Sequence, residues 1–429
     1  MNTAMIICVA LFIIMMIMLV ANKVPMGVTG LTILAMLVIF KCLDAKSALS
    51  SFGNANVIII MGMFVVGAGL RKTTMITKIT EYIRRVTNGN FEIAYKGIII
   101  LAVILTSIIT SPAVCFAIVF PILDSICKEF DVSPSKVQFP LGMVCIGCCG
   151  ILPFGFAISQ AAVFDGLMET YGFDMHFTAL DFTRGRLPII AFVILWAFFI
   201  AKKFTPDTPS SIIVGSEDKK VQNTNQITTT QNMIGSVVSI ATIIALIFNA
   251  KIGLASWVIV LTGCVLLLLS GVLSSKEAIS AMPFDIGFMF IGANAMASAL
   301  VSTGTADLIG GKISEALGSN PSNIAMSIVF FIVPFILTQF MNNQAVMNIF
   351  APICLLICKA TGADPRGFLV LICGACLTAF MTPSATAAIP MVMAAGGYDV
   401  KDLAKMGWLF AVLVSILYIA YVTITMPAF

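Results

Sequence analysis

Three side-chain amides stand together inside a long apolar stretch of this chain, in the segment TQFMNNQAVMNIFAPI (338–353). Amides can bind an anion through N–H groups and a hard cation through carbonyl oxygens. A less polar segment with the same setting, TSPA (110–113), lies in the first half of the chain. We predict that these two segments bind substrate through Ser111, Pro112, Ala113, Asn342, Asn343 and Gln344. The alternative is that the amides only join neighbouring helices.

Two further segments place a proline inside apolar sequence, CCGILPFG (148–155) and FMTPSAT (380–386). Proline breaks a helix and frees backbone carbonyls, and the helix that follows exposes N–H groups able to bind an anion. We therefore add Thr382, Pro383 and Ser384 to the predicted substrate site. Neither pair of segments contains Arg or Lys, so an anion would be held by amides, hydroxyls, helix dipoles and co-bound cations.

Hydroxyl and carbonyl oxygens near these segments could coordinate Na⁺, the expected coupling ion, because hard cations prefer oxygen ligands. The first half offers Ser107, Ser111 and the carbonyls around Gly150. The second half offers Thr338, the Met341 carbonyl, Asn343 and the carbonyl near Met381. No other cofactor is expected.

Composition decides what kind of protein positions these residues. The chain has 429 residues, of which 59% are hydrophobic and only 10% are charged. Soluble domains carry about 25% charged residues, and a bilayer core of about 30 Å is crossed by roughly 20 apolar residues. This indicates an all-α polytopic membrane protein, whereas the alternation typical of a membrane barrel is missing. The first 21 residues are interpreted as a spanning helix and not as a signal peptide.

The two halves of the chain resemble each other. KSALSSF begins at Lys46 and KEAISAM at Lys276, and Pro153 matches Pro383, an offset of 230 in both pairs (276 − 46 and 383 − 153). We predict two repeats, 1–203 and 233–429, joined by a polar linker at 204–232. Apolar runs predict helices near 3–21, 26–42, 55–70, 138–168 and 187–203, then near 234–250, 255–273, 285–302, 366–395 and 406–426.

Each repeat also contains an apolar segment interrupted at its centre, 97–127 and 323–359. The arms are read as about 13–14 residues, or roughly 20 Å as helices, and too short to span. We interpret them as re-entrant hairpins; the alternative for the first is a single helix kinked at Pro112. Five spans and one hairpin per repeat invert the second repeat relative to the first. With both termini outside, basic residues then favour the inside by roughly two to one, as expected for a plasma membrane protein, while Arg184 and Arg186 fall outside.

Moderately polar segments follow the third helix of each half, at 71–93 and 303–322, and the first is expected to lie along the inner membrane interface. The single histidine, His176, is interpreted as a loop residue. The acids Asp124, Asp165 and Asp285 are interpreted as residues near helix ends, not as functional intramembrane acids.

At the tips and breaks the sequence resembles the divalent anion:sodium symporter family of the ion transporter superfamily. The most specific match is AFMTPSATAAIPMVMAAGGYDVKDLAKMG (379–407), with the Thr-Pro of the second break and a Gly-Tyr and Asp-x-x-Lys-x-Gly ending. The resemblance implies a homodimer with a scaffold and a transport domain that moves like an elevator. It also implies that the tips and breaks bind the substrate's carboxylates beside two Na⁺ ions, with Asn343 as the family's tip Asn.

The sequence departs from the family at the first half, where Ser111-Pro112-Ala113 replaces the usual Ser-Asn-Thr and Leu152 precedes Pro153 in place of Thr. The expected function is Na⁺-coupled transport of small anions, most simply di- or tricarboxylates, with no nucleic-acid partner. Proton-coupled transport or uncoupled exchange of another carboxylate or oxyanion is the alternative. A zinc protease is excluded by the single histidine, so an enzyme is not expected. A sensor or scaffold without transport activity stays open.

Overall fold

The computed structural model describes residues 3–21, 23–109, 111–153, 156–211, 228–248, 252–305 and 321–428, and the regular structure in these ranges is helical. The first half contains α1 (Thr3–Ala21), α2 (Met26–Ile39), α3 (Ala45–Ser50), α4 (Ala55–Lys72), α5 (Thr74–Val86), α6 (Phe91–Ile108), α7 (Pro112–Glu129), α8 (Gln138–Gly147), α9 (Phe156–Thr170) and α10 (Ala179–Leu195). The second half contains α11 (Thr229–Ile247), α13 (Ser256–Leu269), α14 (Ser275–Ala281), α15 (Phe284–Ser302), α17 (Asn323–Thr338), α18 (Asn343–Thr361), α19 (Arg366–Cys376), α20 (Ala388–Gly396) and α21 (Val400–Thr425).

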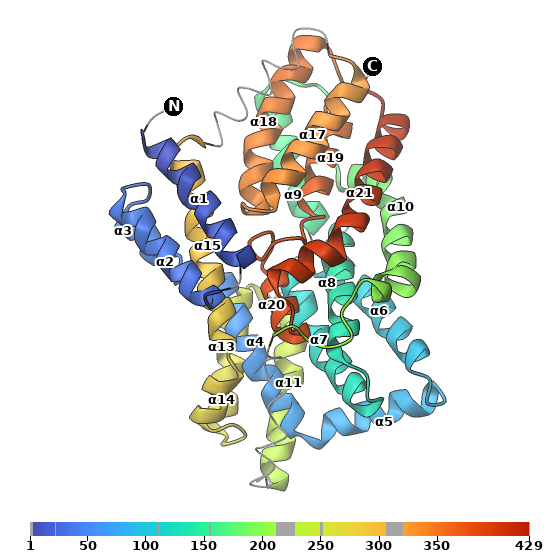
Figure 1. Ribbon diagram of the computed structural model, residues 1–429. Helices are drawn as coiled ribbons and strands as arrows, with labels where there is room; N and C mark the ends of the chain where they lie inside the picture. Colours follow the sequence, from blue (N-terminus) through green and yellow to red (C-terminus); the bar gives the residue numbers. More distant parts are fainter. Residues whose placement is uncertain are drawn as a thin grey trace.

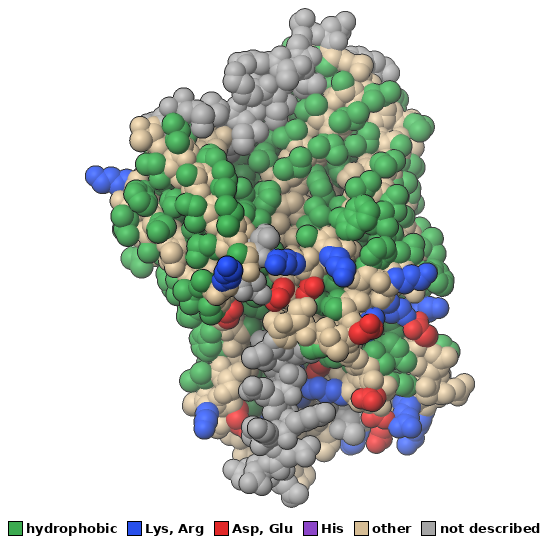
Figure 2. All heavy atoms as spheres, in the orientation of Figure 1, with side chains coloured by type: hydrophobic (Ala, Val, Ile, Leu, Met, Phe, Trp, Pro, Cys, Tyr) green, Lys and Arg blue, Asp and Glu red, His purple; other side chains and the backbone are tan. Residues whose placement is uncertain are grey.

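Length and composition allow several of these helices to cross a membrane. Within the described ranges six stretches are long and apolar enough: Ala45–Lys72, Ala179–Lys203, Thr229–Leu246, Phe284–Ser302, Asn343–Thr361 and Val400–Thr425. Figure 2 shows hydrophobic side chains covering the upper part of one face, with charged side chains gathered in its lower part. By length and composition, the described helices thus agree with the expected multi-pass membrane protein.

The helices form two groups (Figure 1). The first group contains α1–α4, α11 and α13–α15, and the second contains α6–α10 and α17–α21. In the first group α2 packs against α15, and α13 packs against α4. Gly30 and Gly292 meet so closely that a methyl group on Gly292 would overlap the Gly30 backbone, which brings α2 and α15 together. Small residues permit this kind of close helix packing in membranes.

Each interrupted segment consists of two separate helices that pack against each other, α6 with α7 and α17 with α18. The alternative of one long kinked helix at Pro112 is therefore wrong. The predicted arm length is also wrong, because α6 and α7 have 18 residues each and α18 has 19, or about 27–28 Å. Figure 1 shows α17 and α18 in the upper part of the molecule and α6 and α7 in the lower part.

The long fourth apolar segment of each half is broken, as the prolines predict. The helix expected over 138–168 separates into α8 and α9, and the one expected over 366–395 separates into α19 and α20. Two other helices begin earlier than hydropathy suggests. Capping boxes start α10 after Thr178 and α21 after Asp399, because the charged first turns of these helices hide them from a search for apolar runs.

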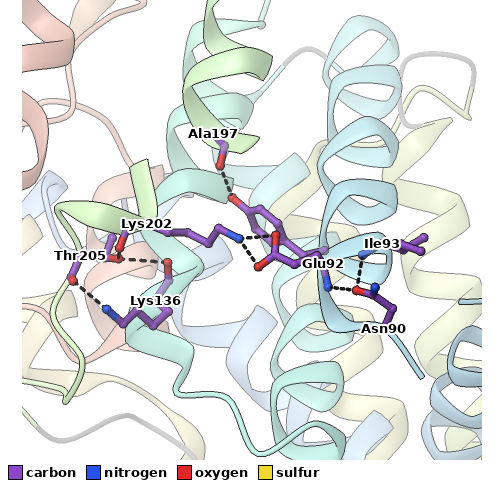
Figure 3. A network of polar contacts seen from close by, with 8 residues as sticks. Asn90, Glu92, Ile93, Lys136, Ala197, Lys202 and Thr205 are labelled. Carbon is purple, nitrogen blue, oxygen red and sulfur yellow. Dashed lines mark hydrogen bonds and ion pairs between the residues drawn. The ribbon is translucent and has the colours of Figure 1, made fainter. Parts of the chain in front are cut away.

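Polar contacts join the lower ends of the second group (Figure 3). The N-terminal turn of α6 is capped by Asn90, and its Glu92 forms a 2.5 Å ion pair with Lys202 beyond the end of α10. Thr205 and Lys136 exchange hydrogen bonds of 3.2 and 3.4 Å next to it. Residues 204–211, the start of the predicted polar linker, contact the helices, and the Ser210 N–H donates to the Gly397 carbonyl at 2.8 Å. Residues 212–227 lie outside the described ranges.

The structure describes more of the first moderately polar segment than of the second. Residues 74–86 form the helix α5, which lies across the lower end of the molecule in Figure 1. It exposes the large side chains Tyr82 and Val86. Most of 303–322 lies outside the described residues.

Candidate functional site

A cavity of about 130 Å³ lies where the two helix groups meet. It is lined by both hairpin tips, by the second break and by α4 and α15, through Asn56, Ser111, Pro112, Ala113, Phe290, Ala293, Asn294, Ala297, Asn342, Asn343, Ser384, Ala385, Thr386 and Ala387. The structure thus brings together six of the nine predicted substrate residues, from segments more than 200 positions apart. The polar lining consists of amides and hydroxyls, without a charged side chain among these residues.

Three helix N-termini end at this cavity. They are those of α7 at Pro112, α18 at Asn343 and α20 at Ala388, each next to lining residues. Each N-terminus carries unpaired N–H groups and about half a positive charge. Ser111, the N-cap of α7, does not use its side chain to cap the helix, and neither does Ala387 before α20. At α20, however, the Ile389 N–H donates to the Thr386 carbonyl at 3.0 Å and Pro390 has no N–H, so α7 offers an anion more backbone donors than α20 does.

The second tip is ordered by its own amides. Asn342 caps α18 by accepting from the Gln344 N–H at 2.8 Å, and Asn343 accepts from the Thr338 hydroxyl at 2.8 Å. Gln344 donates to Asn348 at 3.3 Å and is absent from the cavity lining. The structure therefore places Asn342 and Asn343 at the cavity and turns Gln344 along α18. Met341, whose carbonyl was predicted as a cation ligand, is buried beside them.

Gln339 joins the second tip to the second break, although no sequence pattern predicted this contact. Its Oε1 accepts from the Met381 N–H at 3.1 Å, while its carbonyl accepts from the Ser384 hydroxyl at 3.0 Å and from Thr382. Thr382 thus faces Gln339, and neither Thr382 nor Pro383 lines the cavity. Ser384 does both. The signal available in the sequence was a fourth amide in the same apolar stretch, four residues before Asn343.

The first tip is less polar, as its sequence predicts. The Ser107 hydroxyl donates to the Val103 carbonyl of its own helix at 2.9 Å, and Ser111, Pro112 and Ala113 line the cavity. Thr110 lies outside the described residues. Gly150, at the first break, has a positive φ of 66° and packs against Phe156, where a Cβ would not fit.

Arg186, counted in the sequence among the basic residues on the outer side, contacts the first break. The side chain is fully buried in α10. Its guanidinium donates to the carbonyls of Cys149 at 3.0 Å and Gly150 at 3.4 Å, and to the Tyr418 hydroxyl at 2.8 Å. The charge count treated every Arg alike, whereas burial depends on contacts with distant segments.

Asn56 and Asn294 also line the cavity, and neither was predicted. They come from α4 and α15 of the first helix group, and Asn294 lies 3.5 Å from the Ser51 hydroxyl. Both are amides within apolar helices, so the signal that drew attention to Asn342 was present at these positions too. What identifies them is the position of α4 and α15 against the tips.

The acids and the histidine take no part in this cavity. His176 is exposed and pairs with Asp165 at 3.1 Å, so its interpretation as a loop residue is confirmed. Asp124 pairs with Lys128 at 3.3 Å. Asp285 accepts from the Gly27 N–H at 2.8 Å and so links α15 to the start of α2.

Comparison with known proteins adds the family. The model of the sodium:sulfate symporter transmembrane region matches residues 1–426. The chain belongs to this family. The resemblance to anion:sodium symporters is therefore confirmed, and the protein is a membrane transporter by family.

Individual relatives are distant. An uncharacterised transporter of Synechocystis is 26% identical over 172 residues, 40% of this chain and 27% of the relative. Solute carrier family 13 member 2 of Rattus norvegicus is 28% identical over 142 residues, 33% of this chain and 24% of the relative. The human Na(+)/dicarboxylate cotransporter 3 is 28% identical over 137 residues, 32% of this chain and 22% of the relative. The matched segments thus span about a quarter of the relatives' own length.

Proposed function

We propose that this protein is a secondary transporter of small di- or tricarboxylates, or of similar oxyanions, coupled to Na⁺. The observation that carries the proposal is the meeting of three helix N-termini at one uncharged polar cavity. Such a site stabilises an anion without a fixed basic side chain, because oriented N–H groups and dipoles supply the positive potential. By the usual requirement of about 10–15 Å³ per water, the cavity admits roughly ten waters, which suits a small organic anion.

The substrate would contact Ser111, Asn342, Asn343 and Ser384 directly. Pro112 and Ala113 would contribute the N-terminus of α7, while Thr382, Pro383 and Gln344 would hold the tip and the break in place. A hydrogen bond to a charged group is worth about 1.5–3 kcal/mol, so a few of these contacts suffice for binding in the micromolar to millimolar range.

The second half would hold the coupling cation. Thr338 and Asn343 already share a hydrogen bond, and Gln339 connects this tip to Met381, so hydroxyl, amide and carbonyl oxygens lie close together. Oxygen donors of this kind suit Na⁺. The names of relatives such as the Na(+)/dicarboxylate cotransporter favour the same ion. The cavity lining carries no carboxylate or imidazole, which favours Na⁺ coupling over proton coupling.

Alternating access would follow from two inverted repeats, 1–203 and 233–429. The packing of α2 against α15 and of α4 against α13 supports this, because each pair joins a helix of the first half to a helix of the second half. The two hairpins also lie in opposite parts of the molecule. The second helix group would carry the substrate past the first group in an elevator motion, in a homodimer with both termini outside the cell membrane. Asn56 and Asn294 of the first group would then contact the substrate in only part of the cycle.

Uptake of labelled succinate, citrate and sulfate into proteoliposomes, with Na⁺, with K⁺ and across pH, tests the proposal. Asn343→Ala should abolish Na⁺-driven uptake while the melting temperature stays near that of the wild type. The matched control is Asn323→Ala, at the first residue of α17 and outside the cavity lining. Unchanged uptake in Asn343→Ala would refute the site. Uptake driven by pH alone would favour the proton-coupled alternative, and no uptake of any anion would favour a sensor.

A further inference from the structure

Arg186 forms a charged contact that the transport site does not explain. It is completely buried, and its described hydrogen-bond partners are backbone carbonyls and the Tyr418 hydroxyl, without a carboxylate. A buried charge without an opposite charge is costly and requires full hydrogen bonding. Here the carbonyls of Gly147, Cys149 and Gly150 supply it at 3.0–3.4 Å. Gly147 is the last residue of α8 and the other two follow it, at the negative end of the helix dipole, which attracts a cation.

These are the carbonyls from which a first-half Na⁺ site was predicted. A hard cation bound to the Gly150 oxygen at about 2.4 Å would lie within about 6 Å of the Arg186 Nη1, which is 3.4 Å from the same oxygen. Two positive charges this close repel strongly in a low-dielectric interior. The guanidinium therefore already places a positive charge at the carbonyls of the first break.

The corresponding position at the second break holds a glycine in place of the arginine. Aligned on their capping boxes, α10 and α21 read Asp181-x-x-Arg184-x-Arg186 and Asp402-x-x-Lys405-x-Gly407. Gly407 touches the second break, where its Cβ position would lie 3.0 Å from Phe380 and Met381. Arg186 touches Gly150, and by the Pro153–Pro383 offset of 230 Gly150 corresponds to Phe380 (150 + 230), which Gly407 touches. A glycine in one half thus corresponds to a guanidinium in the other.

We propose that Arg186 is a built-in cation that replaces a coupling Na⁺ at the first break, so that only the second half binds Na⁺ during transport. The inference rests on the proposed function and specifies its ion coupling. At the second break, the described hydrogen bonds come from neutral groups, Gln339, Thr382 and Ser384. No fixed cation competes with Na⁺ there among these contacts.

Equivalent hydroxyls in the two halves allow a matched test, because Ser107 and Thr338 are 231 positions apart (338 − 107). Purified protein is titrated with NaCl at constant ionic strength against choline chloride, and the melting temperature is recorded without any anion. Thr338→Ala should raise the half-saturating Na⁺ concentration at least about tenfold, the effect of losing roughly 1.4 kcal/mol. Ser107→Ala should leave this concentration within about twofold of the wild type, as expected if its hydroxyl meets no Na⁺.

The Na⁺ dependence of transport provides a second, independent measurement. In proteoliposomes the wild type should show a Hill coefficient for Na⁺ close to one, because the coefficient cannot exceed the number of sites. Arg186→Gly, which copies Gly407, should add a Na⁺ requirement at the first break, and its Na⁺ dependence should become steeper. A Hill coefficient close to two in the wild type would overturn the inference. So would equal loss of the Na⁺ response in Ser107→Ala and Thr338→Ala.

Different results would refute the proposed transport function and the proposed role of Arg186. Absence of anion uptake would count against the proposed function, while the Na⁺ titration without anion would still decide the role of Arg186. If Arg186→Gly does not fold, the Ser107 and Thr338 variants and the wild-type Hill coefficient decide the matter.

Discussion

Gln339→Met removes the side-chain connection between the second tip and the second break. Gln339 is 3% exposed, and its Oε1 accepts from the Met381 N–H at 3.1 Å. Methionine has a similar length and flexibility and fills the same space. The main-chain carbonyl that binds Thr382 and Ser384 is kept, so the change is confined to the amide.

The loss leaves the Met381 N–H without its partner, which costs about 1–3 kcal/mol when such a group is buried. At 1.4 kcal/mol per tenfold change, the assembled site should form about 5 to 150 times less favourably. We expect both the anion concentration and the Na⁺ concentration for half-maximal uptake to rise within this range. Proteoliposome uptake at varied anion and at varied Na⁺ measures the two effects.

The control is Ser415→Ala in α21, which removes a buried hydroxyl that donates to the Ala411 carbonyl of its own helix at 2.6 Å. This variant should alter stability slightly and leave both half-saturation values unchanged. Gln339→Met with half-saturation values within twofold of the wild type would refute the reasoning, because the tip and the break would then not need the amide to meet.

Two further predictions concern the helices around the site. Gly292→Ala should lower the melting temperature by several degrees, because the methyl group meets the Gly30 backbone, whereas Gly97→Ala, with open space around it, should be neutral or stabilising by up to about 1 kcal/mol; equal melting temperatures would contradict this. Burial alone would raise the pKa of Glu277, but hydrogen bonds from Lys72 and Ser274 outweigh it, and the net pKa lies below its usual value of 4.5. A carboxylate whose pKa is lowered on folding stabilises the folded protein above its unfolded-state pKa, and this stabilisation is lost as the pH falls through the folded-state pKa. Glu277→Gln should therefore reduce the free energy of unfolding by about 0.2–1 kcal/mol near neutral pH and by progressively less in acid. Melting curves across pH would measure this.

Sequence alone determined the features that depend on local chemistry. The apolar composition required helices, Pro153 and Pro383 broke two of them, and the tips at 110–113 and 342–344 interrupted two more. The sequence also showed that the first tip has fewer polar side chains than the second. These predictions succeed because helix breaking and hydrophobic length are properties of neighbouring residues.

Tertiary structure decided which polar side chains meet. Gln339 and Met381 are 42 positions apart, Arg186 and Tyr418 are 232 apart, and Asn56 shares a cavity with Asn343. Nothing in the residues next to Arg186 distinguishes it from Arg184, which lies two positions earlier and donates to Thr425 at an exposed position. One guanidinium is buried and the other is not because of the rotation of α10 against α21 and the first break. That rotation depends on packing between distant segments, and it places a fixed positive charge where the sequence suggested a sodium ion.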